Sequence, residues 1–95
     1  MPYDHEHPAV QAKLLDLLKA LVARKGTEEE AAAVIQRGQS LVSGMLARKK
    51  PVSVHSAMRL AEDAGYDLRE IYADPVGAKP LWIDADKKVV EKQPQ

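Results

Sequence analysis

The stretch from Thr27 to Pro51, TEEEAAAVIQRGQSLVSGMLARKKP, predicts two short helices joined by a tight turn. Thr27 begins the first helix, because its hydroxyl can accept a hydrogen bond from a free backbone N–H while Glu30 reaches back to the Thr27 amide. Small and apolar residues give this helix a narrow face, and the polar run at residues 36–38 interrupts the pattern. Apolar residues then return at helical spacing, at Leu41, Val42, Met45 and Leu46. A second helix is therefore expected at about residues 39–48.

Four residues of this stretch resemble a helix-turn-helix motif. The motif has a small residue in its first helix so that the second can cross closely, and Ala32 holds that place, while Ile35, Val42 and Met45 fall where the motif puts its apolar contacts. The string Gln39-Ser40-x-Val42-Ser43 resembles the recognition helix of the phage Cro and repressor family of helix-turn-helix proteins, in which a Gln-Ser pair opens the helix in the major groove. The resemblance implies that four residues face base edges: Gln39, Ser40, Ser43 and Gly44.

One departure from that family concerns the turn. The family has glycine at the position of Gln36 and an apolar residue at the position of Arg37, whereas this chain has its glycine at Gly38. We therefore expect a turn that is longer or differently shaped.

Composition bounds the class of protein. At 95 residues the chain is long enough for one small domain with a core. It contains no cysteine, which excludes disulfides and thiolate metal sites. No apolar run approaches the roughly 20 residues that span a bilayer, and the N-terminus lacks the basic and apolar regions of a signal peptide. We expect a cytoplasmic protein that needs no membrane and no cofactor.

The formal net charge is zero, but the charge is unevenly distributed. No Asp or Glu lies between Glu30 and Glu62, and one face of the fold can therefore be basic and attract phosphates. The alternative is that the uneven charge has no functional meaning, since many small proteins carry uneven charge. Four basic residues of this interval are our candidate phosphate contacts: Arg37, Arg48, Lys49 and Lys50.

The region before Thr27 predicts a long amphipathic helix and the main core element. From Ala9 to Lys25 apolar residues recur at steps of three and four. Pro8 suits the first helical position and Gly26 the stop. The residues before Pro8 are expected to form a loose lead-in, and His5 and His7 there lack a third ligand for a metal ion.

Two further helices are expected after Pro51. Ser53 is a candidate cap for a fourth helix that Gly65 ends, and Asp67 starts a short fifth helix through Tyr72. This order is similar to the five-helix DNA-binding domain of the Cro and repressor family. We expect a mainly α fold, with a lambda-repressor-like helix-turn-helix domain at residues 1–75 and a tail at residues 76–95.

The tail predicts a short β-hairpin, because apolar β-favouring residues flank an Asp-rich turn at residues 84–88. The string Ile83-Asp84-Ala85-Asp86 followed by Val89 resembles the C-terminal β-ribbon of Cro, which pairs with its copy in a dimer. The alternative is that Trp82 folds back on the helices. Five residues are the expected dimer interface: Leu81, Trp82, Ile83, Val89 and Val90.

Together these features predict a sequence-specific DNA-binding transcriptional regulator. The resemblance implies a repressor of phage or prophage type that binds a pseudo-palindromic operator as a homodimer, with double-stranded DNA as its partner. Gln39 is the foremost base contact, since its amide can pair bidentately with adenine. Two alternatives remain: an antitoxin-type regulator whose tail binds a protein, and a helical protein–protein adapter without specific DNA binding.

We expect no enzymatic activity and no small-molecule substrate. The sequence has no cysteine nucleophile, no glycine-rich phosphate loop and no His–carboxylate set on regular structure. No catalytic residue and no metal ligand is therefore assigned.

Overall fold

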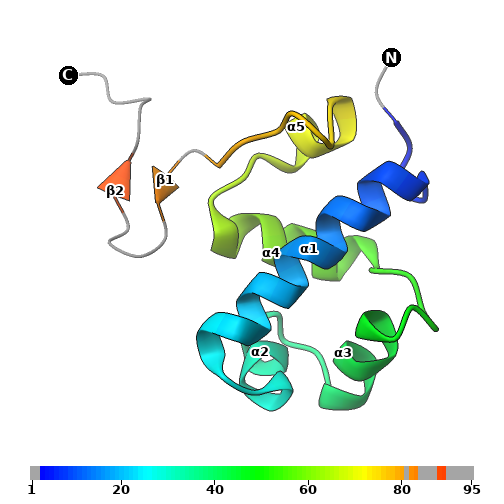
Figure 1. The fold of residues 1–95 in the computed structure, drawn as a ribbon, viewed down its shortest axis with the longest axis vertical. Coiled ribbons are helices and arrows are strands. Elements are labelled where there is room, and N and C mark those ends of the chain that lie inside the picture. The colour runs from blue at the N-terminus through cyan, green and yellow to red at the C-terminus, as the bar shows by residue number, and fades with distance from the viewer. Residues whose placement is uncertain (1–2, 81, 84–87, 90–95) are drawn as a thin grey trace.

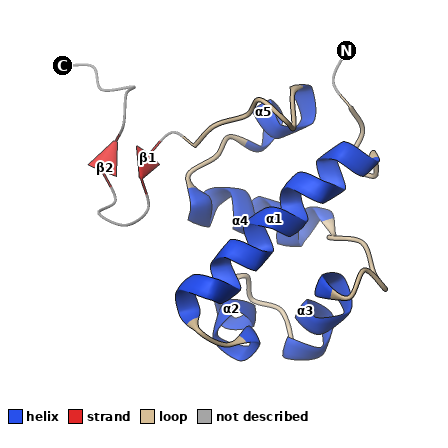
Figure 2. Ribbon diagram, in the orientation of Figure 1, coloured by secondary structure: helices blue, strands red, loops and turns tan. Residues whose placement is uncertain are grey.

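The computed structural model describes residues 3–80, 82–83 and 88–89, and this part of the chain is mainly α-helical (Figure 1). Five helices follow one another along it: α1 (Pro8–Lys25), α2 (Glu28–Val34), α3 (Gln39–Leu46), α4 (Val54–Ala64) and α5 (Leu68–Ala73). α1 contacts each of the other four. It crosses the helical body diagonally, with α2 near its C-terminal end and α5 toward its N-terminal end (Figure 2). The predicted helices are confirmed.

α1 begins and ends at local signals. The His7 ring accepts a hydrogen bond at Nδ1 from the Ala9 N–H at 3.1 Å, and Pro8 lies in the first turn, where its missing N–H costs nothing. Gly26 ends the helix with a φ of 93°, a left-handed conformation that glycine adopts without strain. The buried side of α1 supplies the largest part of the core: Val10, Leu14, Leu15, Leu17, Leu18 and Leu21.

Residues 3–7 pack on the helical body, so the expectation of a loose segment is wrong for this part of the lead-in. The Tyr3 N–H donates to the carbonyl oxygen of Tyr72 at 2.7 Å. The His5 ring joins two distant segments, since Nε2 lies 2.7 Å from the Val52 carbonyl oxygen and Nδ1 lies 2.8 Å from the Tyr72 hydroxyl. Gln11 closes the junction by accepting the Val52 N–H at 2.8 Å. Burial at this junction raises the pKa of Tyr72.

The predicted caps begin α4 and α5. The Ser53 hydroxyl accepts the Ser56 N–H at 3.1 Å and donates to the buried Ser56 hydroxyl at 3.0 Å. Gly65 ends α4 in the left-handed region, with a φ of 82°. Asp67 then caps α5 by accepting the Arg69 N–H at 3.0 Å, and the Arg69 side chain bonded to it holds the pKa of Asp67 below its ordinary value.

β1 (Trp82–Ile83) and β2 (Lys88–Val89) pair in antiparallel fashion. Trp82 lies opposite Val89, and Ile83 lies opposite Lys88. Leu81, Val90 and the turn at residues 84–87 lie outside the described residues. The structure therefore describes only these two residue pairs of the predicted hairpin.

Candidate nucleic-acid interface

α2 and α3 form a closely packed pair whose inner side belongs to the core. Ala32 of α2 is 3% exposed, and Ile35, which follows α2, is fully buried. On α3, Val42 is fully buried and Met45 is 1% exposed. All four residues that the sequence assigned to the helix contact are thus in the core. One side of α3 packs on the core, and its other side faces solvent.

The turn between the two helices spans Ile35–Gly38 and bends at Gln36. Gln36 has a φ of 59°, in the left-handed region, and its N–H donates to the Ala33 carbonyl at 3.2 Å. The next N–H, that of Arg37, donates to the Ala32 carbonyl at 2.9 Å. Gly38 has an ordinary φ of −75° and stands at the start of α3, where it provides no side-chain cap. The bend therefore falls on glutamine, and the glycine of the turn does not supply it.

α3 is shorter than the helix expected at residues 39–48, because the chain reverses after Leu46. Arg48 has a φ of 63°, and the N–H of Lys49 donates back to the Gly44 carbonyl at 2.9 Å. A left-handed residue cannot continue an α-helix, so the reversal ends α3. It also returns Lys49 and Lys50 along the last turn of the helix.

Gln39 and Ser40, two of the four candidate base contacts, are exposed in the first turn of α3. Ser43, one turn further on, is half-buried, and its hydroxyl donates to the Glu28 carboxylate of α2. Gln39 Nε2 lies 3.4 Å from the same Glu28 oxygen. Because a carboxylate only accepts hydrogen bonds, it holds the NH2 group of Gln39 toward α2 and leaves the amide oxygen outward.

Sequence reasoning missed Glu28 as a neighbour of the candidate site. Its place in the first turn of α2 explains its charge, since the helix dipole favours an anion there. No local pattern reveals that α3 brings Gln39 and Ser43 to it, because 11 and 15 residues separate the partners. The contact follows only from the packing of the two helices, and it puts one carboxylate beside an otherwise basic stretch.

Gly44, the fourth candidate base contact, lies under the methylene stem of Lys50. A Cβ atom added to Gly44 would lie 3.3 Å from Lys50 Cδ and 3.7 Å from Lys50 Cε. The exposed side of α3 at this position is thus occupied by a lysine that comes from the following loop.

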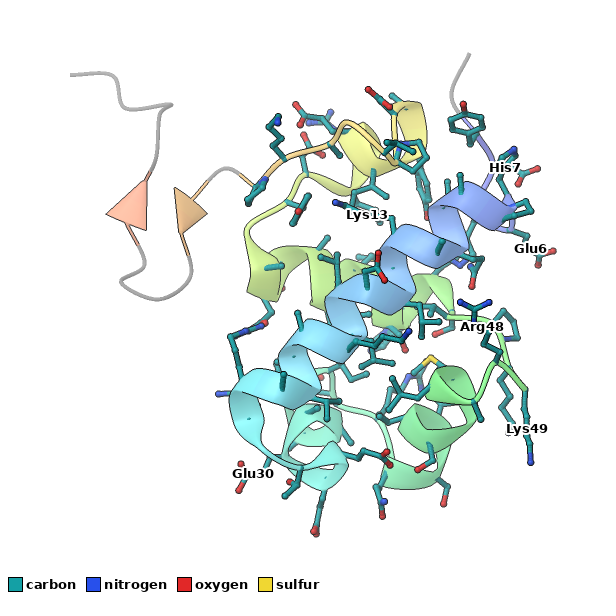
Figure 3. The ribbon with its side chains drawn as sticks, in the orientation of Figure 1. Glu6, His7, Lys13, Glu30, Arg48 and Lys49 are labelled. Carbon is teal, nitrogen blue, oxygen red and sulfur yellow. The ribbon has the colours of Figure 1, made fainter. Side chains whose placement is uncertain are left out.

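The four candidate phosphate contacts differ in exposure. Arg48, Lys49 and Lys50 are exposed in the loop after α3, and Lys49 extends away from the helical body (Figure 3). Arg37 is half-buried, and its Nε is buried without a hydrogen-bond partner among the described residues. Glu30 lies on the far side of α2 from Lys49 (Figure 3). The cations gathered after α3 are therefore separated from the acidic start of α2, apart from Glu28.

Metal ligation and membrane insertion find no support in the part of the chain that the structure describes. No group of three or more His, Cys, Asp or Glu side chains there is placed to hold a metal ion. None of the described helices combines the length and apolar character needed to cross a membrane.

No protein-family model, curated protein or solved structure matches this chain. Its functional assignment therefore depends on the residues and their geometry.

Proposed function

We propose that the chain is a sequence-specific DNA-binding transcriptional regulator, a Cro-like repressor that lays α3 in the major groove. The two-sided character of α3 is the observation that carries the proposal. Val42 and Met45 bury one side of the helix, while Gln39 and Ser40 stay exposed at its N-terminal end. A helix anchored in this way presents a polar edge in a fixed orientation, which is what reading base edges requires.

The fold that accompanies this function is a five-helix lambda-repressor-like domain in which α2 and α3 are the helix-turn-helix. The turn supports the resemblance. Gln36 stands where the family has glycine, and it adopts the left-handed conformation that glycine favours. Ala32 supports it as well, because its small side chain lies buried where the two helices cross.

Gln39 is the proposed principal base contact. Its amide oxygen can accept from N6 of adenine, and its remaining N–H can donate to N7. Such a bidentate pair discriminates adenine from the other bases by ~1–3 kcal/mol. Ser40, next to it and also exposed, is close enough for a second base or a phosphate. The Glu28 contact orients Gln39 before DNA arrives, so less side-chain entropy is lost on binding.

Backbone contacts supply most of the affinity in this proposal. We assign the phosphate contacts to Arg37, Arg48, Lys49 and Lys50, and the counterions released on binding make the affinity fall steeply with salt. The zero net charge of the chain is compatible with this, because local fields and not the total charge steer DNA.

A homodimer completes the proposal. One recognition helix specifies few base pairs, whereas two helices ~34 Å apart read two half-sites of a pseudo-palindrome. We assign the pairing to the C-terminal hairpin, of which the Trp82–Ile83 and Lys88–Val89 pair is described. Overlap of the operator with a promoter then gives repression.

The test is selection of binding sites from random duplex DNA, followed by titration of the selected duplex at several salt concentrations. We expect an inverted repeat, and for Gln39→Ala a loss of discrimination at one position of each half-site of about 10-fold. Gln36→Ala is the matched control, since it removes the same exposed side chain three residues earlier, outside α3, and we expect its preferences to equal those of wild type. A folded wild-type protein that enriches no sequence would refute the proposal.

A protein–protein adapter is the second candidate, and one observation favours it. Val54 and Met58 are 50% and 57% exposed and lie one turn apart on α4, which leaves an apolar strip on the surface. DNA binding that is absent or independent of salt, together with self-association that Val54→Ser and Met58→Ser abolish, would favour this function. Unchanged DNA selection by the same variants would exclude a role of the strip in reading DNA.

A further inference from the structure

Lys50 lies across the exposed side of α3, and its neighbour Lys49 does not share this position. The three stem atoms Cγ, Cδ and Cε of Lys50 would lie 3.3–3.7 Å from a Cβ on Gly44. Gly44 shares its side of α3 with Ser40, one turn before it, and both Ser40 and Ala47 of that side are exposed. The Lys50 stem therefore lies against the last turn of α3, and its ammonium is one bond beyond Cε.

The backbone explains why the stem takes this course. The left-handed Arg48 turns the chain back, and the Lys50 N–H lies 3.3 Å from the Gly44 carbonyl oxygen. The absence of a side chain at Gly44 leaves the space that the Lys50 methylenes occupy. Packing of a long stem on a helix surface while its charge stays in water is the usual behaviour of lysine.

The ammonium is available for an outside partner. Lys50 is exposed, and within residues 3–80 its ammonium forms no hydrogen bond and no ion pair. An ammonium group only donates hydrogen bonds. In the major groove, guanine presents two acceptors, O6 and N7. Adenine places an N6 amino donor beside its N7, cytosine presents a donor, and thymine presents one acceptor, O4, beside a methyl group. A lysine at a base edge thus selects guanine.

We propose that Lys50 is a base-reading residue that selects guanine at the half-site position facing the C-terminal half of α3, and that Gly44 serves to admit its stem. The inference rests on the proposed DNA-binding function, and it moves Lys50 from the phosphates to the base edges. Gln39 then reads adenine from the N-terminal end of α3, and Lys50 reads a guanine further along the same groove.

The experiment compares wild type, Lys50→Met and Lys49→Met by selection from random duplexes and by titration against all four bases at each position of the selected half-site. Methionine keeps an unbranched stem and removes the donors and the charge. Lys49→Met is the matched control, because Lys49 is an exposed lysine in the same loop whose contact with Gly44 is made by its backbone N–H. Thermal unfolding establishes that both variants remain folded.

We expect the wild-type site to contain one guanine for which Lys50→Met loses its preference by about 10-fold or more, while its other positions keep theirs. Lys49→Met should weaken binding to every sequence alike and lower the salt dependence by about one phosphate contact. Lys50→Arg should keep the guanine, since arginine donates to the same two acceptors.

Two results overturn the inference and remain distinguishable. If wild type enriches a site but Lys50→Met weakens all sequences uniformly, as Lys49→Met does, then Lys50 contacts phosphate and only this inference falls. If folded wild type enriches no sequence, the DNA-binding function falls and the inference with it.

Discussion

Gln36 carries a backbone strain that a single substitution should relieve. Its φ of 59° lies in the left-handed region, which costs a residue with a Cβ roughly 1–2 kcal/mol, whereas glycine adopts it freely. Glycine also adds about 0.5–1 kcal/mol of chain entropy to the unfolded state. Gln36→Gly should therefore raise the free energy of unfolding by about 0.5–1 kcal/mol. For a domain of this size that corresponds to a rise in Tm of about 2–8 °C.

The side chain of Gln36 is exposed and forms no hydrogen bond within residues 3–80, so its removal loses no hydrogen bond there. Thermal and urea unfolding followed by circular dichroism measure the effect. Gln36→Ala is the control, since it removes the same side chain but keeps the Cβ, and we expect no gain from it. Gly26→Ala tests the converse: φ is 93° and no atom lies within 4 Å of the new Cβ, so its expected loss of about 1 kcal/mol reflects backbone strain alone. A Gln36→Gly protein no more stable than Gln36→Ala would refute the left-handed bend.

Three further predictions concern packing, titration and DNA affinity. Ala32→Leu should destabilise the fold by about 1–3 kcal/mol in urea unfolding, because three extra carbons enter a position that is 3% exposed; unchanged stability would mean that α2 and α3 do not cross closely there. The pKa of Asp67 is lowered by the Arg69 hydrogen bond, so an NMR titration should place it below 3.8. The ionised Asp67 then contributes to stability above pH 3.8, and this contribution is lost as the pH falls through the lower folded-state pKa. The Asp67→Asn protein should lack this part of the pH dependence of stability. If the chain binds DNA, Glu28→Gln should bind about 2- to 3-fold more tightly at low salt and equally at high salt, since it removes a charge that repels phosphates; equal affinity at both would place Glu28 away from the DNA.

The starts and stops of the helices could be predicted from the sequence because their causes are local. Thr27 accepts the Glu30 N–H at 3.1 Å, as its spacing implied. Gly26 and Gly65 take the left-handed conformation expected of a helix stop. In each case the cap and its partner lie within a few residues, so the pattern of the chain contains both members of the interaction.

Contacts between distant residues could not be predicted in this way. The His5 ring bonds to Tyr72 and to the Val52 carbonyl, across sequence separations of 67 and 47 residues. Nothing in the string MPYDHEHP indicates that these partners exist. For the same reason two contacts of the candidate site were seen only in the structure. The packing of α2 on α3 brings Glu28 to Ser43, and the reversal at Arg48 brings the Lys50 stem over Gly44.

Four of the helices end in a left-handed residue, and the distribution of glycine among them bears on the proposed function. α1 and α4 use Gly26 and Gly65, whereas Gln36 and Arg48 fill the equivalent places at the ends of α2 and α3. Stability alone favours glycine at all four positions. The left-handed conformation of Gln36 and Arg48 therefore lowers the stability of the fold by roughly 1–2 kcal/mol each. The two helices that bear the strain are the two that form the candidate interface. At Arg48 the proposed function supplies a reason, because glycine there would remove a cation to which the proposal assigns a phosphate contact.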